Sequence, residues 1–198
     1  MRLKYVNKAD VILGTARAVP PGDRMAGVRQ DGPLAAALIP EAGETEPLYE
    51  LIELLFFAYR DFVGDPDRLL ETFSFGRAHH RVIHFVDRNP GLTIAELLDI
   101  LKITKQSLNR VLKELITQGF IESRLGIEDR RQRHLHLTET GQRLARDLAS
   151  LQTRRIARAI SECGATDALA ARRFLSAMIE PDLRPSVQKM IASKGPQK

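Results

Sequence analysis

The sequence predicts a mainly α-helical protein that carries one small β-hairpin. From residue 47 onward, apolar residues recur at helical spacing over most of the chain. The patterns of two short segments, residues 120–125 and 132–137, instead predict strands on either side of a polar turn. Two short helical stretches joined by a tight turn directly precede that hairpin. This order of helix, turn, helix and hairpin is that of a winged helix-turn-helix.

The composition fits one domain with an appendage and excludes several classes of protein. The chain has 198 residues, a net charge of +5 and a pI near 9.6. No apolar run is long enough to span a membrane, and MRLKYVNKAD lacks the apolar stretch of a secretory signal. The single cysteine, Cys163, excludes an internal disulfide framework and fits a reducing compartment. We therefore expect a cytoplasmic protein.

The first 46 residues are rich in proline and glycine and show no sustained period, which predicts a flexible N-terminal arm. Its apolar island, residues 34–39, is either a helical turn packed on the body or a clasp on a partner. Residues 47–88 are expected to form two linking and dimerisation helices. The first, over residues 47–63, should end at Gly64-Asp65-Pro66. The second should run from Arg68 to Arg88, with Gly76 as a weak point or a break.

Residues 89–137 are expected to form the winged helix-turn-helix itself. Thr93 and Glu96 have the spacing of a capping box at the start of a short helix over residues 94–102. Thr104 should cap a second helix over residues 105–118, which Gly119 ends. This second helix has one clean apolar face, made of Leu108, Val111, Leu112, Leu115 and Ile116.

The opposite face of that second helix has the side chains of a helix that reads DNA. Amides can bond adenine and Arg can bond guanine in the major groove, while Lys and a helix N-terminus can hold phosphates. The candidate contacts are Thr104, Lys105, Gln106, Ser107, Asn109, Arg110 and Lys113. Residues 101–136 also hold eight basic residues against four acidic ones, and this excess favours an anionic partner.

The hairpin tip is the second candidate DNA contact. It carries Arg130, Arg131 and Arg133, and Arg124 lies on the first strand. Arginines on a protruding tip suit a minor groove, whose negative potential attracts guanidinium groups. Asp129 is placed to pair with Arg131 and to orient it.

The C-terminal part, residues 138–183, is expected to supply further dimerisation helices. Thr138 should cap a helix that reaches Cys163 and spans about 39 Å, and Gly164 should break it. The helix is too long for one small body to cover its apolar stripe, so a symmetric partner is expected. A last helix should run over about 167–180, and residues 184–198 should form a flexible tail.

The stretches TKQSLNRVLKELITQGFIESR and DRRQRHLHLTETG resemble the MarR family of bacterial winged-helix regulators over roughly residues 48–180. GRAHHRVIHFV and ITKQSL further resemble its PetP-type branch. The resemblance implies an obligate homodimer built by the first and the last two helices. It also implies a recognition helix over about 104–118 and a wing arginine that corresponds to Arg131. Many members bind small anionic or phenolic effectors between the dimerisation and DNA-binding parts.

Several groups of residues allow more than one interpretation. The aromatic residues Phe56, Tyr59, Phe62 and Phe85 either line an effector pocket or belong to the core. His79, His80 and His84 are expected as ordinary polar helix positions, not metal ligands, and Cys163 as a packed thiol. No motif of an enzyme or of a cofactor site is present in convincing context. A winged helix that binds protein would carry an apolar or acidic reading face, which this sequence lacks.

Overall fold

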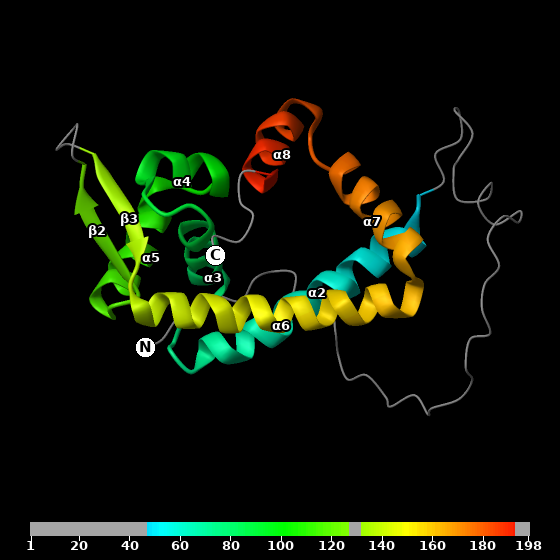
Figure 1. The fold of residues 1–198 in the computed structure, drawn as a ribbon, viewed down its shortest axis with the longest axis horizontal. Coiled ribbons are helices and arrows are strands. Elements are labelled where there is room, and N and C mark those ends of the chain that lie inside the picture. The colour runs from blue at the N-terminus through cyan, green and yellow to red at the C-terminus, as the bar shows by residue number, and fades with distance from the viewer. Residues whose placement is uncertain (1–46, 127–131, 193–198) are drawn as a thin grey trace, which may run out of the picture. The chain divides into compact units, whose positions relative to one another are not determined.

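The computed structural model describes residues 47–126 and 132–192. By its contacts the chain divides into two units, Met1–Leu48 and Tyr49–Lys198, and the elements below belong to the second. They are α2 (Tyr49–Glu71), α3 (Arg77–Arg88), β1 (Leu92–Thr93), α4 (Ile94–Leu101), α5 (Lys105–Thr117), β2 (Ile121–Leu125), β3 (Arg133–Leu137), α6 (Glu139–Cys163), α7 (Ala165–Ala177), the 3-10 turn Pro181–Leu183 and α8 (Arg184–Ala192) (Figure 1). Within the described ranges, no helix is long and apolar enough to cross a membrane.

Helix α2 is longer than predicted, because it does not end at Gly64-Asp65-Pro66 but continues to Glu71. The predicted stop was therefore wrong. Val63, Pro66 and Leu70 are buried, so packing of this stretch outweighs the cost of a proline inside a helix. Asp65 also accepts a hydrogen bond from the guanidinium of Arg155 in α6 at 2.8 Å, which fixes the second half of α2 against α6.

The predicted second helix is divided, and its first residues belong to α2. A turn follows Glu71, and α3 begins only at Arg77 with Gly76 as its N-terminal cap residue. The break that the sequence allowed at Gly76 is thus confirmed, whereas the predicted start at Arg68 was wrong. The Gly76 N–H donates to Nδ1 of His79 at 3.1 Å, and this bond helps to start the helix.

The helix-turn-helix forms as its local signals predict. Thr93 and Glu96 make the reciprocal bonds of a capping box at the start of α4. These bonds from the backbone and hydroxyl of Thr93 lower the pKa of the Glu96 carboxyl. Lys102 takes a left-handed conformation, with φ of 50°, in the turn before α5. The Thr104 hydroxyl accepts a hydrogen bond from the Ser107 N–H and so caps α5.

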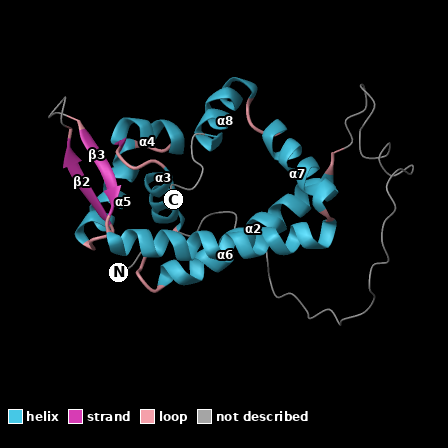
Figure 2. Ribbon diagram, viewed as in Figure 1, coloured by secondary structure: helices cyan, strands magenta, loops and turns pink. Residues whose placement is uncertain are grey.

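The sheet has three antiparallel strands in the order β1-β3-β2 (Figure 2). The two predicted strands pair in register, with Ile121 opposite Leu137 and Leu125 opposite Arg133. Strand β1 was not predicted, because two residues are too few to show a strand period. It pairs through Leu92 opposite Leu135, and so ties the turn before α4 to the hairpin.

One hydrophobic core holds this part of the molecule together. It combines side chains from the end of α2, α3, both helices of the helix-turn-helix, the hairpin and the first half of α6. The residues with almost no exposed surface include Leu70, Val82, Ile83, Leu97, Leu108, Leu115, Ile121, Leu135 and Leu148. The helix-turn-helix therefore rests on helices from both sides of it in the sequence.

Helix α6 starts directly against the turn that follows α5. The Thr138 hydroxyl donates to the Gly119 carbonyl at 2.6 Å and accepts from the Gly141 N–H at 3.1 Å. Gly141 lies against the Phe120 backbone, and a Cβ at position 141 would be only 2.1 Å from that carbonyl oxygen. The Thr-x-x-Gly sequence thus joins the long helix to the helix-turn-helix at a close backbone contact.

The C-terminal end differs from the sequence-based expectation. Helix α6 ends at Cys163 before Gly164, as predicted, but α7 ends at Ala177 instead of near residue 180. Residues 184–192, predicted within a flexible tail, form α8. The Arg184 side chain donates to the carbonyls of Ala177 and Ile179, which satisfies free groups at the end of α7 and fixes the start of α8.

Candidate nucleic-acid interface

Helix α5 presents two faces of opposite character. Leu108, Val111, Leu112 and Leu115 are buried in the core. The seven predicted contact residues are all exposed, which confirms their placement on the outer face: Thr104, Lys105, Gln106, Ser107, Asn109, Arg110 and Lys113. The outer face is therefore open to a partner along its first two and a half turns.

The exposed face of α5 carries no acidic side chain. Glu114, the only acid in the helix, is half-buried, and its carboxylate bonds Nε2 of His79 in α3 at 2.8 Å. None of the ion pairs found among the described residues involves Lys105, Arg110 or Lys113. These three cations thus remain available to neutralise the charge of an anionic partner.

The N-terminal turn of α5 has a fixed geometry. The Thr104 hydroxyl accepts from the Ser107 N–H at 3.2 Å and donates to the Ser107 hydroxyl oxygen at 2.9 Å. Thr104 therefore acts first as a cap. The Ser107 hydroxyl keeps its own hydrogen, which can be donated to an acceptor outside the protein.

The wing is described except for its tip. Gly126 N–H bonds the Gln132 carbonyl at 3.0 Å, so the strands remain paired up to the last described residues on each side. Arg133 is exposed, and Arg124 is exposed but forms an ion pair with Glu122 of the same strand. Asp129, Arg130 and Arg131 lie outside the described residues, so their predicted roles rest on the sequence.

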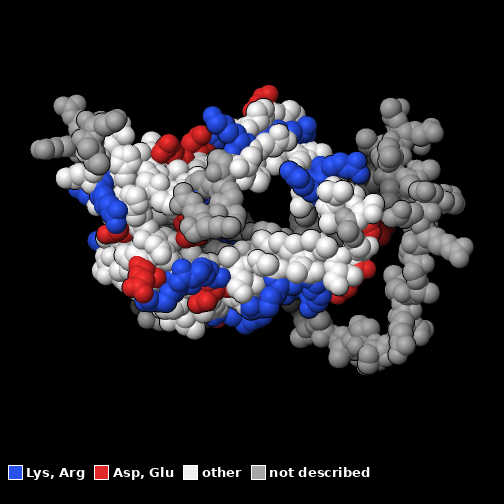
Figure 3. All heavy atoms as spheres, viewed as in Figure 1, with Lys and Arg blue, Asp and Glu red and all other residues white. Residues whose placement is uncertain are grey.

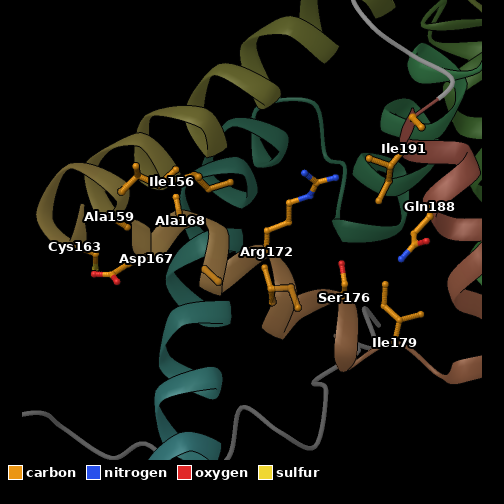
Figure 4. A pocket seen from close by; sticks show the side chains of 14 residues that line it. Ile156, Ala159, Cys163, Asp167, Ala168, Arg172, Ser176, Ile179, Gln188 and Ile191 are labelled. Carbon is orange, nitrogen blue, oxygen red and sulfur yellow. The ribbon is translucent and has the colours of Figure 1, made fainter. Parts of the chain in front are cut away.

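The aromatic residues proposed to line an effector pocket do not share one environment. Phe56 and Tyr59 are exposed by 67% and 55%, Phe62 is half-buried, and Phe85 packs against the core. A cavity of about 920 Å³ lies elsewhere, between α6, α7 and α8, and none of the four residues lines it (Figure 4). Effector binding therefore stays a prediction.

His79, His80 and Cys163 depart from their expected settings, whereas His84 is exposed as an ordinary polar helix position. His79 and His80 are buried, with 9% of each residue exposed, so they are not ordinary polar surface positions. Burial lowers the pKa of His80, with a smaller contribution from His84. In the described part of the chain, no cluster of three or more candidate ligands could hold a metal ion. Cys163 is exposed in the single chain, not packed, and lines the cavity of Figure 4.

Some basic residues of α6 form ion pairs within the chain. Arg143 pairs with Glu139 at 2.7 Å, and Arg155 pairs with Asp65 at 2.8 Å. On the face in Figure 3, both basic and acidic side chains lie along this helix. The charges of α6 are therefore mixed, unlike those of the outer face of α5.

Two capped helices, a tight turn and an antiparallel wing on a single core define a winged helix-turn-helix protein. A model of the MarR family matches residues 73–132. The chain is also 49% identical, over 145 residues, to the HTH-type transcriptional regulator PetP of Rhodobacter capsulatus, covering 73% of this chain and 87% of that protein. The chain belongs to the MarR family of transcriptional regulators, as its sequence motifs indicated. Its relatives there are regulators, not enzymes.

Solved structures agree on the fold. A crystal structure of Streptococcus pneumoniae FabT in complex with DNA matches with a TM-score of 0.61 and 18% identity, over 67% of this chain and 94% of FabT. A crystal structure of MarR matches with a TM-score of 0.53 and 23% identity, over 70% of this chain and 99% of that one. The prediction of a mainly α fold with a small β wing, in a MarR-like architecture, is confirmed.

Proposed function

We propose that the protein binds double-stranded DNA as a homodimer, at a pseudopalindromic operator, and thereby regulates transcription. The observation that carries this proposal is the outer face of α5, which is exposed, cationic, rich in amides and free of acids. An α-helix of this kind fits the major groove. The FabT structure, which has the same fold and was solved in complex with DNA, supports this proposal.

Within this proposal, the residues of α5 divide by the chemistry of their side chains. Gln106, Asn109 and Arg110 carry groups that can form paired hydrogen bonds with base edges, so they govern sequence choice. Lys105 and Lys113 carry compact charges that hold phosphates without reading sequence. Thr104 and Ser107 add contacts at the helix N-terminus, where a phosphate is favourably placed.

The wing adds a contact in the flanking minor groove. Arg131 is proposed to enter the groove, with Asp129 orienting it, while Arg124, Arg130 and Arg133 strengthen the positive field. A guanidinium enters a narrow groove more readily than an ammonium group, because it is more weakly hydrated. Replacing Arg131 should therefore weaken sites with A/T-rich flanks more than sites with G/C-rich flanks.

The homodimer is supported by the apolar surface that one chain leaves open. We call the segments that bear it the interface helices, namely residues 49–60, 156–163 and 165–179. Their exposed large apolar side chains are Tyr49, Ile52, Leu54, Leu55, Phe56, Phe57, Tyr59, Ile156, Ile160, Leu169, Phe174, Leu175 and Met178. Large apolar patches on a protein surface usually mark an interaction site. A two-fold partner would cover it and set the two α5 helices about one DNA turn apart.

A small aromatic or anionic effector is proposed as the regulator of DNA affinity. Phe56 and Tyr59 lie on an interface helix, and Phe85 lies on α3 beneath the helix-turn-helix. A ligand that contacts both groups in the dimer would favour one separation of the two α5 helices. Screening small aromatic acids for reduced operator binding tests the effector proposal, independently of the proposal that the protein binds DNA.

The experiment that tests the main proposal is selection of bound sequences from random duplexes with the full chain. We expect a pseudopalindrome with half-sites centred about 10 bp apart. Asn109→Ala and Gln106→Ala should each cost about 1–3 kcal/mol of binding and relax one base position. Lys113→Ala should weaken all sequences alike. Gln118→Ala, at the other end of the helix, is the matched control, and failure to enrich any motif would refute the proposal.

A further inference from the structure

A side-chain hydrogen bond joins α5 to α3, the helix on which it rests. Nε2 of His79, in the first turn of α3, lies 2.8 Å from Oε2 of Glu114 in α5. The two residues are 35 positions apart in the sequence. The His79 side chain is only 11% exposed and that of Glu114 is 43% exposed, so the bond lies at the edge of the core.

The His79 ring is held on its edge and on its face. Its Nδ1 accepts a hydrogen bond from the Gly76 N–H at 3.1 Å. Nδ1 therefore bears no hydrogen, and Nε2 is the protonated nitrogen that donates to the Glu114 carboxylate. The ring also stacks on Phe75, with centroids 4.6 Å apart and planes 13° apart, and Phe75 in turn packs edge-on against Phe120. The ring cannot turn without breaking these contacts.

This bond can restrain the rotation of α5 about its own axis, which its apolar contacts leave free. The buried face of α5 is made of Leu and Val side chains, whose packing has little directional preference. A hydrogen bond to a charged acceptor is directional and stronger than a neutral one. Glu114 follows Lys113 and lies one turn beyond Arg110, so a rotation of α5 that moved Glu114 would also re-aim both cations.

Helix α3 also holds the first helix of the motif. The Arg81 guanidinium donates to the Leu101 carbonyl at the end of α4, at 3.1 Å. His79 and Arg81 thus bond the motif on either side of its turn, one through each helix. In the same molecule, α3 packs against α2 and α6. Helix α3 therefore lies between these helices and the helix-turn-helix, in contact with both.

We propose that His79 is a positioning residue, which sets the rotation of α5 on α3 through Glu114 and so sets the half-site spacing that the dimer accepts. This inference rests on the proposed function. The bond also keeps the only carboxylate of α5 directed towards α3 and away from the DNA-facing side.

The test compares full-length variants on the selected operator and on versions with one base pair inserted or deleted between the half-sites. Glu114→Ala and His79→Ala should each lower operator affinity about tenfold and reduce the preference for the native spacing. The double variant should lose no more than the larger single loss, because both changes break one bond. Glu114→Gln, which keeps an acceptor, should retain the native spacing preference.

Asp99→Ala is the matched control, since it removes an exposed acid of the helix-turn-helix that pairs only with Lys102. It should leave the spacing preference unchanged. A lower affinity of Glu114→Ala with the native spacing preference intact would overturn the proposal, and so would additive losses in the double variant.

A readout without DNA separates this inference from the proposed function. The ring ¹⁵N shifts of His79 should report hydrogen on Nε2 in the wild-type chain and change in Glu114→Ala, whether or not DNA binds. Unchanged shifts would overturn the bond itself. Absence of selective DNA binding by the wild-type chain, with these shifts as expected, would refute the proposed function alone.

Discussion

Two regions of the molecule differ in how far their apolar side chains are covered. They are the winged-helix core, residues 70–148, and the interface helices. In the core, Leu70, Leu97 and Leu108 are fully buried by residues of their own chain. In the interface helices, Phe56, Leu169 and Leu175 remain 57–67% exposed. Covering such side chains stabilises a structure by about 1.5–3 kcal/mol each. The core thus covers its own apolar residues, whereas the proposed dimer would be needed to cover those of the interface helices.

The largest expected effect comes from adding one methyl group inside the core. In Gly141→Ala, the new Cβ would lie 2.1 Å from the Phe120 carbonyl oxygen, so the start of α6 must move away from the α5–β2 turn. We expect the free energy of unfolding to fall by about 3 kcal/mol, as measured by urea denaturation.

Gly64→Ala is the control for that change, because its Cβ would meet nothing closer than Arg68 Nη1 at 3.9 Å. Gly64 lies inside α2, where alanine favours the helix, so the variant should be neutral or more stable by up to about 1 kcal/mol. Equal losses in the two variants would show that the contact at Gly141 is not special.

The second prediction places a charge among the interface helices. Phe56→Asp should raise the dimer dissociation constant about 100-fold, because a carboxylate would be buried without a partner, while the core stays folded. Sedimentation at micromolar concentration measures the dimer. Ile116→Asp makes the same kind of change at an exposed apolar residue of α5, outside the interface helices, and should leave the dimer intact. A wild-type chain that is monomeric at these concentrations would contradict the comparison.

Sequence analysis succeeded where a side chain caps backbone groups a few residues away in the chain. The caps at Thr93, Thr104 and Thr138 act on backbone groups three residues away, and the structure contains all three. The apolar stripe of α5 likewise predicted its buried face at Leu108, Val111, Leu112 and Leu115, but it was wrong at Ile116, which is 41% exposed at the end of the helix. Gly119, with φ of 74°, ends that helix as its sequence predicted.

The misses arose where distant residues decide the outcome. The local stop signal at Gly64-Asp65-Pro66 failed because the second half of α2 packs against α6, where Arg155 bonds Asp65. Strand β1 exists only because Leu135 pairs with Leu92. The bond of His79 to Glu114 joins residues 35 positions apart, and no local pattern predicted it. The DNA contacts themselves stay predictions, because exposure alone does not define a partner.

The third prediction concerns acid pH at α3. Burial lowers the pKa of His80, and Asp67 of α2, which raises it, only partly offsets this. The unfolded chain therefore binds a proton at His80, near pH 6.5, more readily than the folded chain. Below pH 6.5 the folded state loses up to about 1.4 kcal/mol per pH unit from this group, until the lower folded pKa is reached. Stability should thus fall with falling pH in this window.

Urea denaturation at several values between pH 5 and 7.5 measures that dependence. In His80→Asn the unfolding free energy should depend less steeply on pH than in the wild type. The difference in slope corresponds to the uptake of at most one proton on unfolding, whatever the absolute stability of the variant. Burial lowers the pKa of His84 and of His136 as well, so a residual slope is expected, and His84→Asn and His136→Asn are its controls. Identical slopes in wild type and His80→Asn would show that His80 is not the group responsible.

The smallest expected effect is the loss of a single cap within the core. Thr93→Ala removes the hydroxyl that accepts the Glu96 N–H and donates to the Glu96 carboxylate. The change should cost about 1 kcal/mol of unfolding free energy. Thr140→Ala removes an exposed hydroxyl that bonds only the Arg143 side chain, and should cost less than about 0.5 kcal/mol. Because both residues belong to the winged-helix core, neither loss should vary with protein concentration, in contrast to Phe56→Asp. If the effect of Thr93→Ala disappeared at high protein concentration, the partner chain would also stabilise α4. Residues 70–148 would then not be stabilised by their own chain alone.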